Sequence, residues 1–143
     1  MQLCQYCFNL KNITDLDEII KRESEFAFIE RRSNYIYVRY KDMTVIDEHG
    51  LKVHGEYFKE LCNGKIYPMI VDATDIDAKM TYEARLAISN SAAKRLYFSC
   101  QAIVVNTTPS RLFANFYLKY HNSDFPIKIF SNLNDAKNWI KHI

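Results

Sequence analysis

The chain has 143 residues and a mass of 16.9 kDa, the size of a single domain. Hydrophobic residues make up 48% and charged residues 25%, and only three Gly and three Pro occur, which excludes long linkers and low-complexity segments. The formal charge of +2 is too even to favour nucleic acid as a partner, and no apolar run is long enough to span a membrane. Because no signal-peptide pattern follows Met1, we expect a cytoplasmic protein.

Residues 1–24 are expected to form an N-terminal extension, followed by one domain over residues 25–143. Apolar residues at helical spacing predict one short helix near residues 14–22. Cys4 and Cys7 have the spacing of a zinc knuckle or a redox pair, but no second pair of ligands follows at a suitable spacing. We therefore favour two reduced thiols there, and we expect no metal and no cofactor.

Two runs of aromatic and β-branched residues predict a hairpin at residues 25–31 and 34–41. If its tyrosines are exposed, they would suit a two-fold interface, so a homodimer is one expected assembly. These tyrosines are Tyr35, Tyr37 and Tyr40.

A helical stripe predicts a helix over residues 44–62, and Asn63-Gly64 supplies its end, since Gly tolerates the left-handed conformation of a helix C-cap. Cys62 and Cys100 have apolar neighbours and are expected to be buried. The apolar run at residues 66–72 is bounded by turn residues and predicts a central buried strand.

A loop is expected at residues 73–80, and Thr81, followed by good helix formers, predicts a capped helix from residue 81 to about 96. Its inward residues are predicted to be Ala84, Ile88, Ala92 and Leu96. Ser89-Asn90-Ser91 is expected to break or bend this helix. Polar groups thus converge at the carboxyl end of a core strand, where open α/β sheets place ligands or partners.

The continuous apolar run from Ala102 to Val105 predicts another buried strand at residues 101–106, as in parallel sheets covered on both faces. A helix to about residue 121 follows, with Thr108 as its cap and Pro109 at its first position. Its inward stripe is predicted to be Leu112, Phe113, Phe116 and Tyr120. A strand at residues 126–130 and a helix beginning at Ser131 or Asn132 complete the chain.

Strands alternating with helices predict an α/β fold with a mixed sheet of four to five strands, an N-terminal hairpin and right-handed βα crossovers. This order resembles the STAS domain superfamily, that is, the anti-sigma-factor antagonists with the SpoIIAA-like fold. The resemblance covers roughly residues 25–143. It lies in three segments: Ile70-Val71-Asp72 with Thr74, residues 102–110, and residues 125–139.

The chain looks still more like an uncharacterised bacteroidete family of STAS-like proteins, with which it shares Tyr-Pro, Asp and Glu-Ala-Arg landmarks. In the antagonists, an Asp-Ser-Ser-Gly turn precedes the helix, and one of its serines accepts phosphate. Here the corresponding residues are Met80-Thr81-Tyr82-Glu83, so Thr81 is the candidate phosphoacceptor. An ordinary N-cap role for Thr81 is favoured over phosphorylation, because Glu83 would oppose the added charge.

The resemblance implies a non-enzymatic regulatory domain that acts by binding a protein partner. Its contact surface is expected to be the loop after the central strand, the next helix start, and the turn after the following strand. The candidate partner- or ligand-binding residues are Asp72, Thr74, Asp75, Asp77, Thr81, Tyr82, Arg85, Asn106, Thr107, Ser110 and Arg111.

Three alternatives remain open. Relatives are also compared with CRAL-TRIO lipid-binding domains, so the chain could carry or sense an apolar, lipid-like molecule in a pocket of Leu112, Phe113 and Phe116, although a plain core role for that stripe is favoured. A small hydrolase or transferase would depend on Asp72, yet no catalytic signature occurs. The acidic cluster around Asp72 could bind Mg²⁺, but turn stabilisation is favoured.

Overall fold

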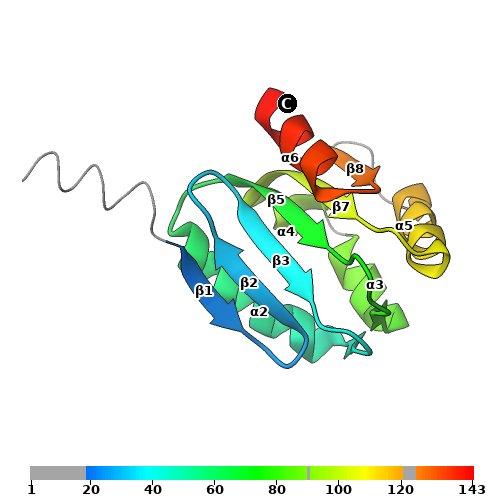
Figure 1. The fold of residues 1–143 in the computed structure, drawn as a ribbon. Helices are drawn as coiled ribbons and strands as arrows, with labels where there is room; N and C mark the ends of the chain where they lie inside the picture. Colours follow the sequence, from blue (N-terminus) through cyan, green and yellow to red (C-terminus); the bar gives the residue numbers. More distant parts are fainter. Residues whose placement is uncertain (1–18, 90, 121–124) are drawn as a thin grey trace, which may run out of the picture.

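The computed structural model describes residues 19–89, 91–120 and 125–143, so Cys4, Cys7 and most of the predicted N-terminal extension lie outside the described residues. Six strands form one mixed sheet (Figure 1). They are β1 (Ile20–Glu23), β2 (Ala27–Arg31), β3 (Ile36–Tyr40), β5 (Tyr67–Asp72), β7 (Phe98–Val104) and β8 (Ile127–Phe130), and this is also their spatial order. The first three are antiparallel, and β3, β5, β7 and β8 are parallel to one another.

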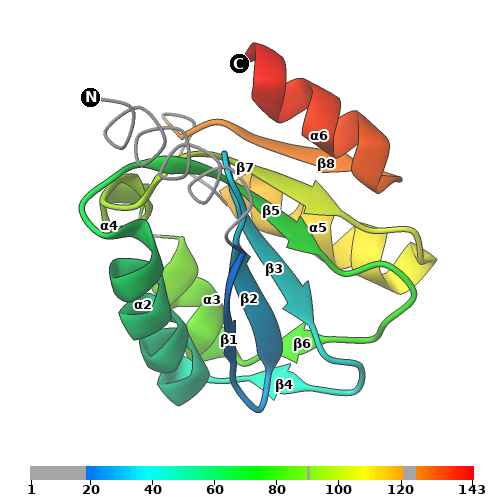
Figure 2. The same ribbon diagram turned by 60° about the vertical axis from the view of Figure 1, so that its left-hand side comes forward.

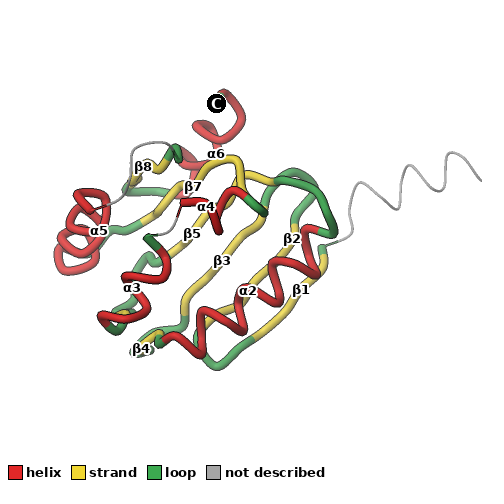
Figure 3. The backbone as a smooth tube through the Cα atoms, turned by 180° about the vertical axis from the view of Figure 1, so that it is seen from behind, coloured by secondary structure: helices red, strands yellow, loops and turns green. Residues whose placement is uncertain are grey.

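Five described helices connect or follow these strands: α2 (Glu48–Cys62), α3 (Tyr82–Ile88), α4 (Ser91–Arg95), α5 (Thr108–Tyr120) and α6 (Leu133–His142). Helices α2 to α5 lie on one face of the sheet, as the views from two sides show (Figures 2 and 3). Helix α6 packs on the opposite face, against β5, β7 and β8. A second, two-stranded parallel sheet joins β4 (Val45–Ile46) to β6 (Lys79–Met80).

Alternation along the strands divides the core between the two faces of the sheet. In β5, Met69 and Val71 face the α2 side, while Ile70 packs with Ala136 and Ile140 of α6. Both sets are buried, which explains why the central strand is a continuous apolar run rather than an alternating one. The predicted α/β fold, with its hairpin and βα crossovers, is confirmed.

The sheet has one strand more than predicted. Residues 20–23 pair with β2 as an antiparallel edge strand, so the predicted helix near residues 14–22 is wrong where it enters the described residues. Ile20 and Arg22 are half-buried and Lys21 and Glu23 exposed, a period-two pattern that suits an edge strand. The proposed domain boundary at residue 25 stays a prediction.

Two helix starts also differ from the prediction. Residues 45–46 form β4, and α2 begins only after Asp47, whose side chain accepts a hydrogen bond from the Gly50 amide at 2.8 Å. Helix α5 is capped by Thr107 rather than Thr108, since the Thr107 hydroxyl accepts from the Ser110 amide. By contrast, the Thr81 cap and the break after Ser89 are confirmed.

The two glycines of α2 differ in their surroundings, which yields a matched prediction. A Cβ at Gly50 would lie 2.6 Å from the buried Phe26 ring, whereas nothing lies within 4 Å of one at Gly55. Gly50→Ala should lower the free energy of unfolding by about 1–2 kcal/mol, since overpacking outweighs the gain in helix propensity. Gly55→Ala should raise it by about 1 kcal/mol. Urea denaturation of both variants checks this, and equal shifts would contradict it.

Candidate functional site

The carboxyl end of β5 is organised by Asp72, which is buried on the α6 side of the sheet. Its Oδ2 accepts a hydrogen bond from the Tyr37 hydroxyl at 2.5 Å. Its Oδ1 accepts three more, from Arg39 Nη1 at 3.0 Å and from the Thr74 amide and hydroxyl at 3.0 and 2.8 Å. The pairing of β3 with β5 sets Arg39 opposite Asp72, so strand register builds this ion pair.

Burial by itself would raise the pKa of Asp72, but the hydrogen bonds from Tyr37 and Thr74 and the charge of Arg39 together lower it below its ordinary value. The same contact and burial raise the pKa of Tyr37, so its hydroxyl remains a donor. A carboxylate whose lone pairs are taken by protein donors stabilises a turn and has little capacity left for a reactant. Among the described residues no group of three His, Cys, Asp or Glu side chains could hold a metal ion.

The loop after β5 is tied to the turn after β7. The Asp75 amide donates to Asn106 Oδ1 at 2.8 Å, and Asn106 Nδ2 donates back to Asp75 Oδ1 at 2.7 Å. Asp75 has a φ of 58°, a left-handed conformation that Asp adopts more readily than most residues. Asp77 is exposed and lies 3.9 Å from the Lys79 amine. The two acids therefore support the loop at its surface.

The predicted site residues on the helices lie at the starts of α3 and α5. Thr81 caps α3 by accepting from the Ala84 amide at 3.2 Å. Ser110 donates to the Ile76 carbonyl at 3.4 Å, which joins α5 to the loop, and Arg111 donates to Ser131 at 2.9 Å. The structure thus joins the loop after β5 to the turn after β7 and to the start of α5, while Asp72 is buried.

A groove of about 590 Å³ runs between α3 and α5. Its lining residues are Tyr82, Arg85, Leu86, Ser89, Phe113, Phe116 and Tyr117. Tyr82, Leu86 and Phe116 are each more than half exposed, as is the neighbouring Leu112. Such a concentration of large exposed apolar side chains is unusual on a protein surface and marks contact sites.

Arg85 lines this groove with a guanidinium group whose hydrogen-bonding capacity is not fully used. Its Nε is buried and has no hydrogen-bond partner among the residues that the structure describes. Its guanidinium carbon lies 5.9 Å from the centre of the Tyr82 ring. A half-buried guanidinium with an unused donor retains the capacity to bind a carboxylate.

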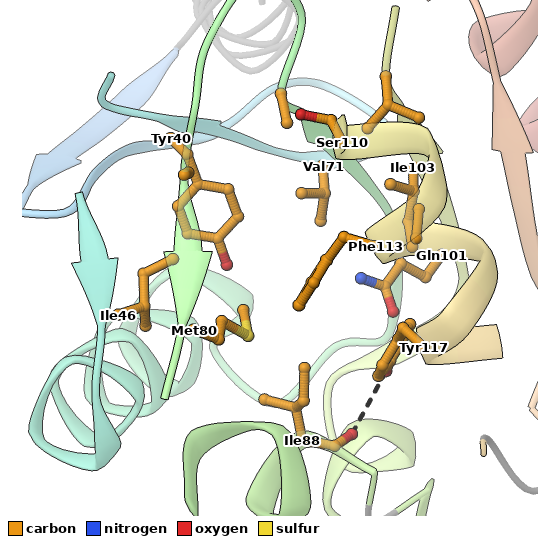
Figure 4. Close-up of a pocket in the computed structure, with 14 residues that line it drawn as sticks. Tyr40, Ile46, Val71, Met80, Ile88, Gln101, Ile103, Ser110, Phe113 and Tyr117 are labelled. Carbon is orange, nitrogen blue, oxygen red and sulfur yellow. Dashed lines mark hydrogen bonds between the residues drawn. The ribbon is translucent and has the colours of Figure 1, made fainter. Parts of the chain in front are cut away.

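A separate cavity lies between the sheet and the helices, on the face opposite Asp72 (Figure 4). It has two adjoining lobes, of about 90 and about 240 Å³. The lobes share six lining residues: Tyr40, Val71, Met80, Ile88, Gln101 and Tyr117. The lining is overwhelmingly apolar, as small-molecule sites usually are.

Few polar groups reach this cavity. Gln101 on β7 points into it (Figure 4), and its Oε1 is buried without a hydrogen-bond partner in the described part of the chain. The Tyr40 hydroxyl faces the same space, and burial raises its pKa to about 12. At the edge of the larger lobe, the Lys94 amine donates to the Tyr117 hydroxyl, and burial lowers the pKa of Lys94 to about 8.

The predicted apolar stripe of α5 is wrong in its orientation. Leu112 and Phe116 are exposed, whereas Ala114 is buried and Phe113 and Tyr117 line the cavity. Helix α3–α4 differs similarly, because the break after Ser89 lets Ala92 and Leu96 face outward. The side chain of Tyr120 lies outside the described residues.

The hairpin tyrosines do not form the exposed patch that was expected for a dimer. Tyr35 is buried against α6, and Tyr37 and Tyr40 are half-buried. The guanidinium of Arg32 covers the Tyr37 ring at 4.1 Å. The homodimer therefore loses the surface on which it was predicted. The predicted burial of Cys62 and Cys100 is confirmed, and burial raises the pKa of Cys62 to about 11.

The sequence analysis missed the residues of β3 that hold the Asp72 carboxylate. Tyr37 and Arg39 hold Asp72, but only the pairing of β3 with β5 reveals this. Gln101 did carry a signal, since it is a polar residue at the start of a run predicted to be buried. Leu86 carried none, as a leucine on a short helix predicts core packing.

Residues 29–143 match the model of a family described as Domain of unknown function (DUF7793). The chain belongs to this family. The DUF7793 match begins within β2 and includes all the described strands and helices that follow it. No protein with a curated description matches the chain.

The crystal structure of an uncharacterized DUF3478-family protein from Shewanella loihica PV-4, described as having a SpoIIAA-like fold, is similar to this DUF7793 chain. The TM-score is 0.54 at 14% identity, over 86% of this chain and 92% of that chain. At that identity the likeness shows the fold alone, and it confirms the predicted STAS-like, SpoIIAA-like fold. The longest described helix of the DUF7793 chain, α2, has 15 residues, and no described helix has the length and apolarity needed to cross a membrane.

Proposed function

We propose that this DUF7793 protein is a non-enzymatic regulatory domain whose α3–α5 groove binds an amphipathic, acidic segment of another protein. The observation that carries the proposal is the set of exposed apolar side chains that line this groove, Tyr82, Leu86 and Phe116, with the exposed Leu112 next to Phe116 on α5. Burying them against a partner would stabilise a complex by the hydrophobic effect.

Charge argues for an acidic partner. Helices α3, α4 and α5 carry five basic side chains, Arg85, Lys94, Arg95, Arg111 and Lys119, against one acidic side chain, Glu83. Opposite charges around an apolar centre raise the association rate and exclude wrong partners. The half-buried guanidinium of Arg85 would gain a charge-assisted hydrogen bond when a carboxylate docks beside it.

Asp72 and Thr74 would stabilise the loop after β5. Thr81 would cap α3, the helix that presents Tyr82 and Arg85. We favour the capping role of Thr81 over phosphorylation, because its hydroxyl already accepts a hydrogen bond from the Ala84 amide. We propose the cytoplasm as the compartment, where thiols such as those of Cys62 and Cys100 stay reduced.

The proposal can be tested by selecting a displayed library of random 16-residue peptides on the wild-type protein, with the Phe116→Asp variant as counter-selection. Peptides that combine apolar and acidic residues, and that shift the amide NMR signals of α3 and α5, would support the proposal. Peptides that bind the Phe116→Asp variant equally well, or that are basic, would overturn it. Phe116 is exposed, so the variant should fold.

Replacing Arg85 or Arg111 by Ala should weaken binding of such a peptide about tenfold each, a loss of about 1.4 kcal/mol, while the melting temperature stays nearly unchanged. Arg111 is exposed, and Arg85 has no ion pair among the described residues, so neither supports much of the fold. Isothermal titration calorimetry and thermal unfolding measure the two effects. Lys141→Ala, on the exposed end of α6, changes the net charge equally and should leave binding intact. A large loss of stability in either arginine variant would make it structural.

The alternative function, a carrier of an apolar ligand, is supported by the cavity and not by the groove. Its predicted lining is corrected to Phe113 and Tyr117 from α5, with Leu112 and Phe116 outside.

A further inference from the structure

The buried oxygen of Gln101 is the starting point. Gln101 is 9% exposed, and its Oε1 has no hydrogen-bond partner among residues 19–89, 91–120 and 125–143. A buried polar atom left unpaired destabilises a folded protein, so such atoms are rare and call for an explanation. A leucine at this position of β7 would have filled the same space without that cost.

The position of Gln101 indicates what the oxygen faces. Its side chain projects from the sheet between Phe113 and Tyr117, with the amide nitrogen toward Phe113 and the oxygen toward Tyr117 (Figure 4). The Tyr40 hydroxyl points into the same space from the other side of Val71. The Gln101 amide and the Tyr40 hydroxyl are therefore two polar groups on the wall of a largely apolar space, and small-molecule sites use such groups to orient a ligand.

The remaining polar groups narrow the ligand class. Lys94 is bonded to Tyr117, His54 to Ser24, and Ser110 to the Ile76 carbonyl, and none of the described Asp or Glu residues lines either lobe. The unmet atom is a hydrogen-bond acceptor, so the ligand must bring a donor. The two lobes together have a volume of about 330 Å³, the low end of the range for small-molecule sites.

We propose that this cavity is a binding site for a small, uncharged, largely apolar molecule, aromatic or aliphatic, whose single O–H or N–H group donates to Gln101 Oε1. The hydrocarbon body of the ligand packs against Val71, Ile103 and Phe113. This inference rests on the cavity and not on the protein-binding groove, so the failure of either proposal leaves the other standing.

The test compares indole, an apolar ring system with one N–H donor, with 1-methylindole, which lacks only the donor. Calorimetry on the full-length chain should show indole binding about tenfold more tightly than 1-methylindole, the gain of one buried hydrogen bond. Carbon NMR signals of Met80 and Ile103 should shift on titration. No saturable indole binding, equal affinities, or unshifted Met80 and Ile103 signals would each overturn the proposal.

The Gln101→Leu variant separates a ligand-binding role from a structural one. Without its ligand, the variant should melt about 2–4 °C above wild type, because an unpaired buried oxygen has been removed. It should bind indole and 1-methylindole with equal affinity. A lower melting temperature, or a retained preference for indole, would show that Gln101 has another role.

A second variant tests the space itself. Ala73→Leu, at the cavity wall beyond β5, should fill part of the smaller lobe and weaken indole binding at least tenfold. Its circular dichroism spectrum should match wild type. Unchanged indole affinity in this variant would place the binding elsewhere and overturn the assignment.

Discussion

Replacing Asp72 by Ala is expected to lower the free energy of unfolding by about 3 kcal/mol, the lower end of the cost of breaking a buried ion pair. The variant leaves Arg39 without its carboxylate and Tyr37 and Thr74 without their acceptor. The cost falls at the lower end because Arg39 is 30% exposed and can still meet water. The melting temperature should fall by about 6–12 °C, which differential scanning calorimetry measures.

Asp77→Ala is the matched control, because it removes an exposed carboxylate from the same loop and should change stability by less than about 0.5 kcal/mol. The lowered pKa of Asp72 means that its contribution is present above pH about 3.9 and is lost as the pH falls through the folded-state pKa. If the Asp72 and Asp77 variants were equally stable, the hydrogen bonds around Asp72 would not support the fold. Lost turnover of a substrate in a stable Asp72 variant would instead favour the enzyme alternative.

Stability should fall by about 2 kcal/mol between pH 7 and pH 5, and His54 should account for the fall. Burial lowers the pKa of His54 to about 4, among the rings of Phe26, Tyr40 and Phe58. In the unfolded chain the imidazole of His54 is protonated with a pKa near 6.5, whereas in the folded protein it is protonated only near pH 4. Stability is therefore complete above pH 6.5 and decreases as the pH falls toward 4.

His54 is also hydrogen-bonded through its ring. Its Nε2 lies 2.8 Å from the Ser24 hydroxyl, which accepts from the Phe26 and Ala27 amides and lies 3.5 Å from the Ala27 carbonyl. Because two amides already donate to Ser24 Oγ, the neutral imidazole, which can accept the hydroxyl proton, suits this contact better than the imidazolium, which cannot.

Urea denaturation at pH 7, 6 and 5 measures this slope. His54→Gln should be nearly flat over that range, and His49→Gln, on the exposed side of the same helix, should keep the wild-type slope. A wild-type stability that is constant from pH 7 to pH 5 would show that His54 is protonated in the folded state. A slope retained in the His54 variant would assign it to another group.

The sequence predicted the elements whose local signals agree with their environment. The strand at residues 66–72 is apolar up to Val71 because both of its faces are covered, and the start of α3 has a capping threonine. The strand β1 could not be found this way, since Ile19 and Ile20 fit a helix and a strand equally well over so short a run. Its pairing with β2 decides between them, and pairing is not a local property.

Helix α5 shows why the orientation of its face was mispredicted. Apolar residues occur all round it, at Leu112, Phe113, Phe116 and Tyr117, so periodicity does not single out one side. The buried residue is the small Ala114, which allows close approach to Ile103 and Val105. The prediction placed the large side chains against the sheet, whereas close packing of a helix on a sheet favours a small residue such as Ala114.

The meeting of the polar turns after β5 and β7 was predictable, and the individual contacts of Asp72 and Gln101 were not. Polar residues after β5 and β7 had to meet, because the carboxyl ends of adjacent parallel strands share one edge of the sheet. The reciprocal bonds of Asp75 and Asn106 follow from that rule. The role of Arg39 depends on strand register, and the isolation of Gln101 Oε1 depends on every neighbour around it.

Phe113 and Tyr117 each form part of two walls, one of the interior cavity and one of the surface groove. A ring that adjusts to a molecule on one side presents a changed surface on the other. Thermodynamic linkage then requires reciprocity: a cavity ligand that tightens docking in the groove tenfold is itself held tenfold more tightly in the docked complex. If both proposed sites are occupied, the two shared rings of α5 would couple the two binding events without a hinge.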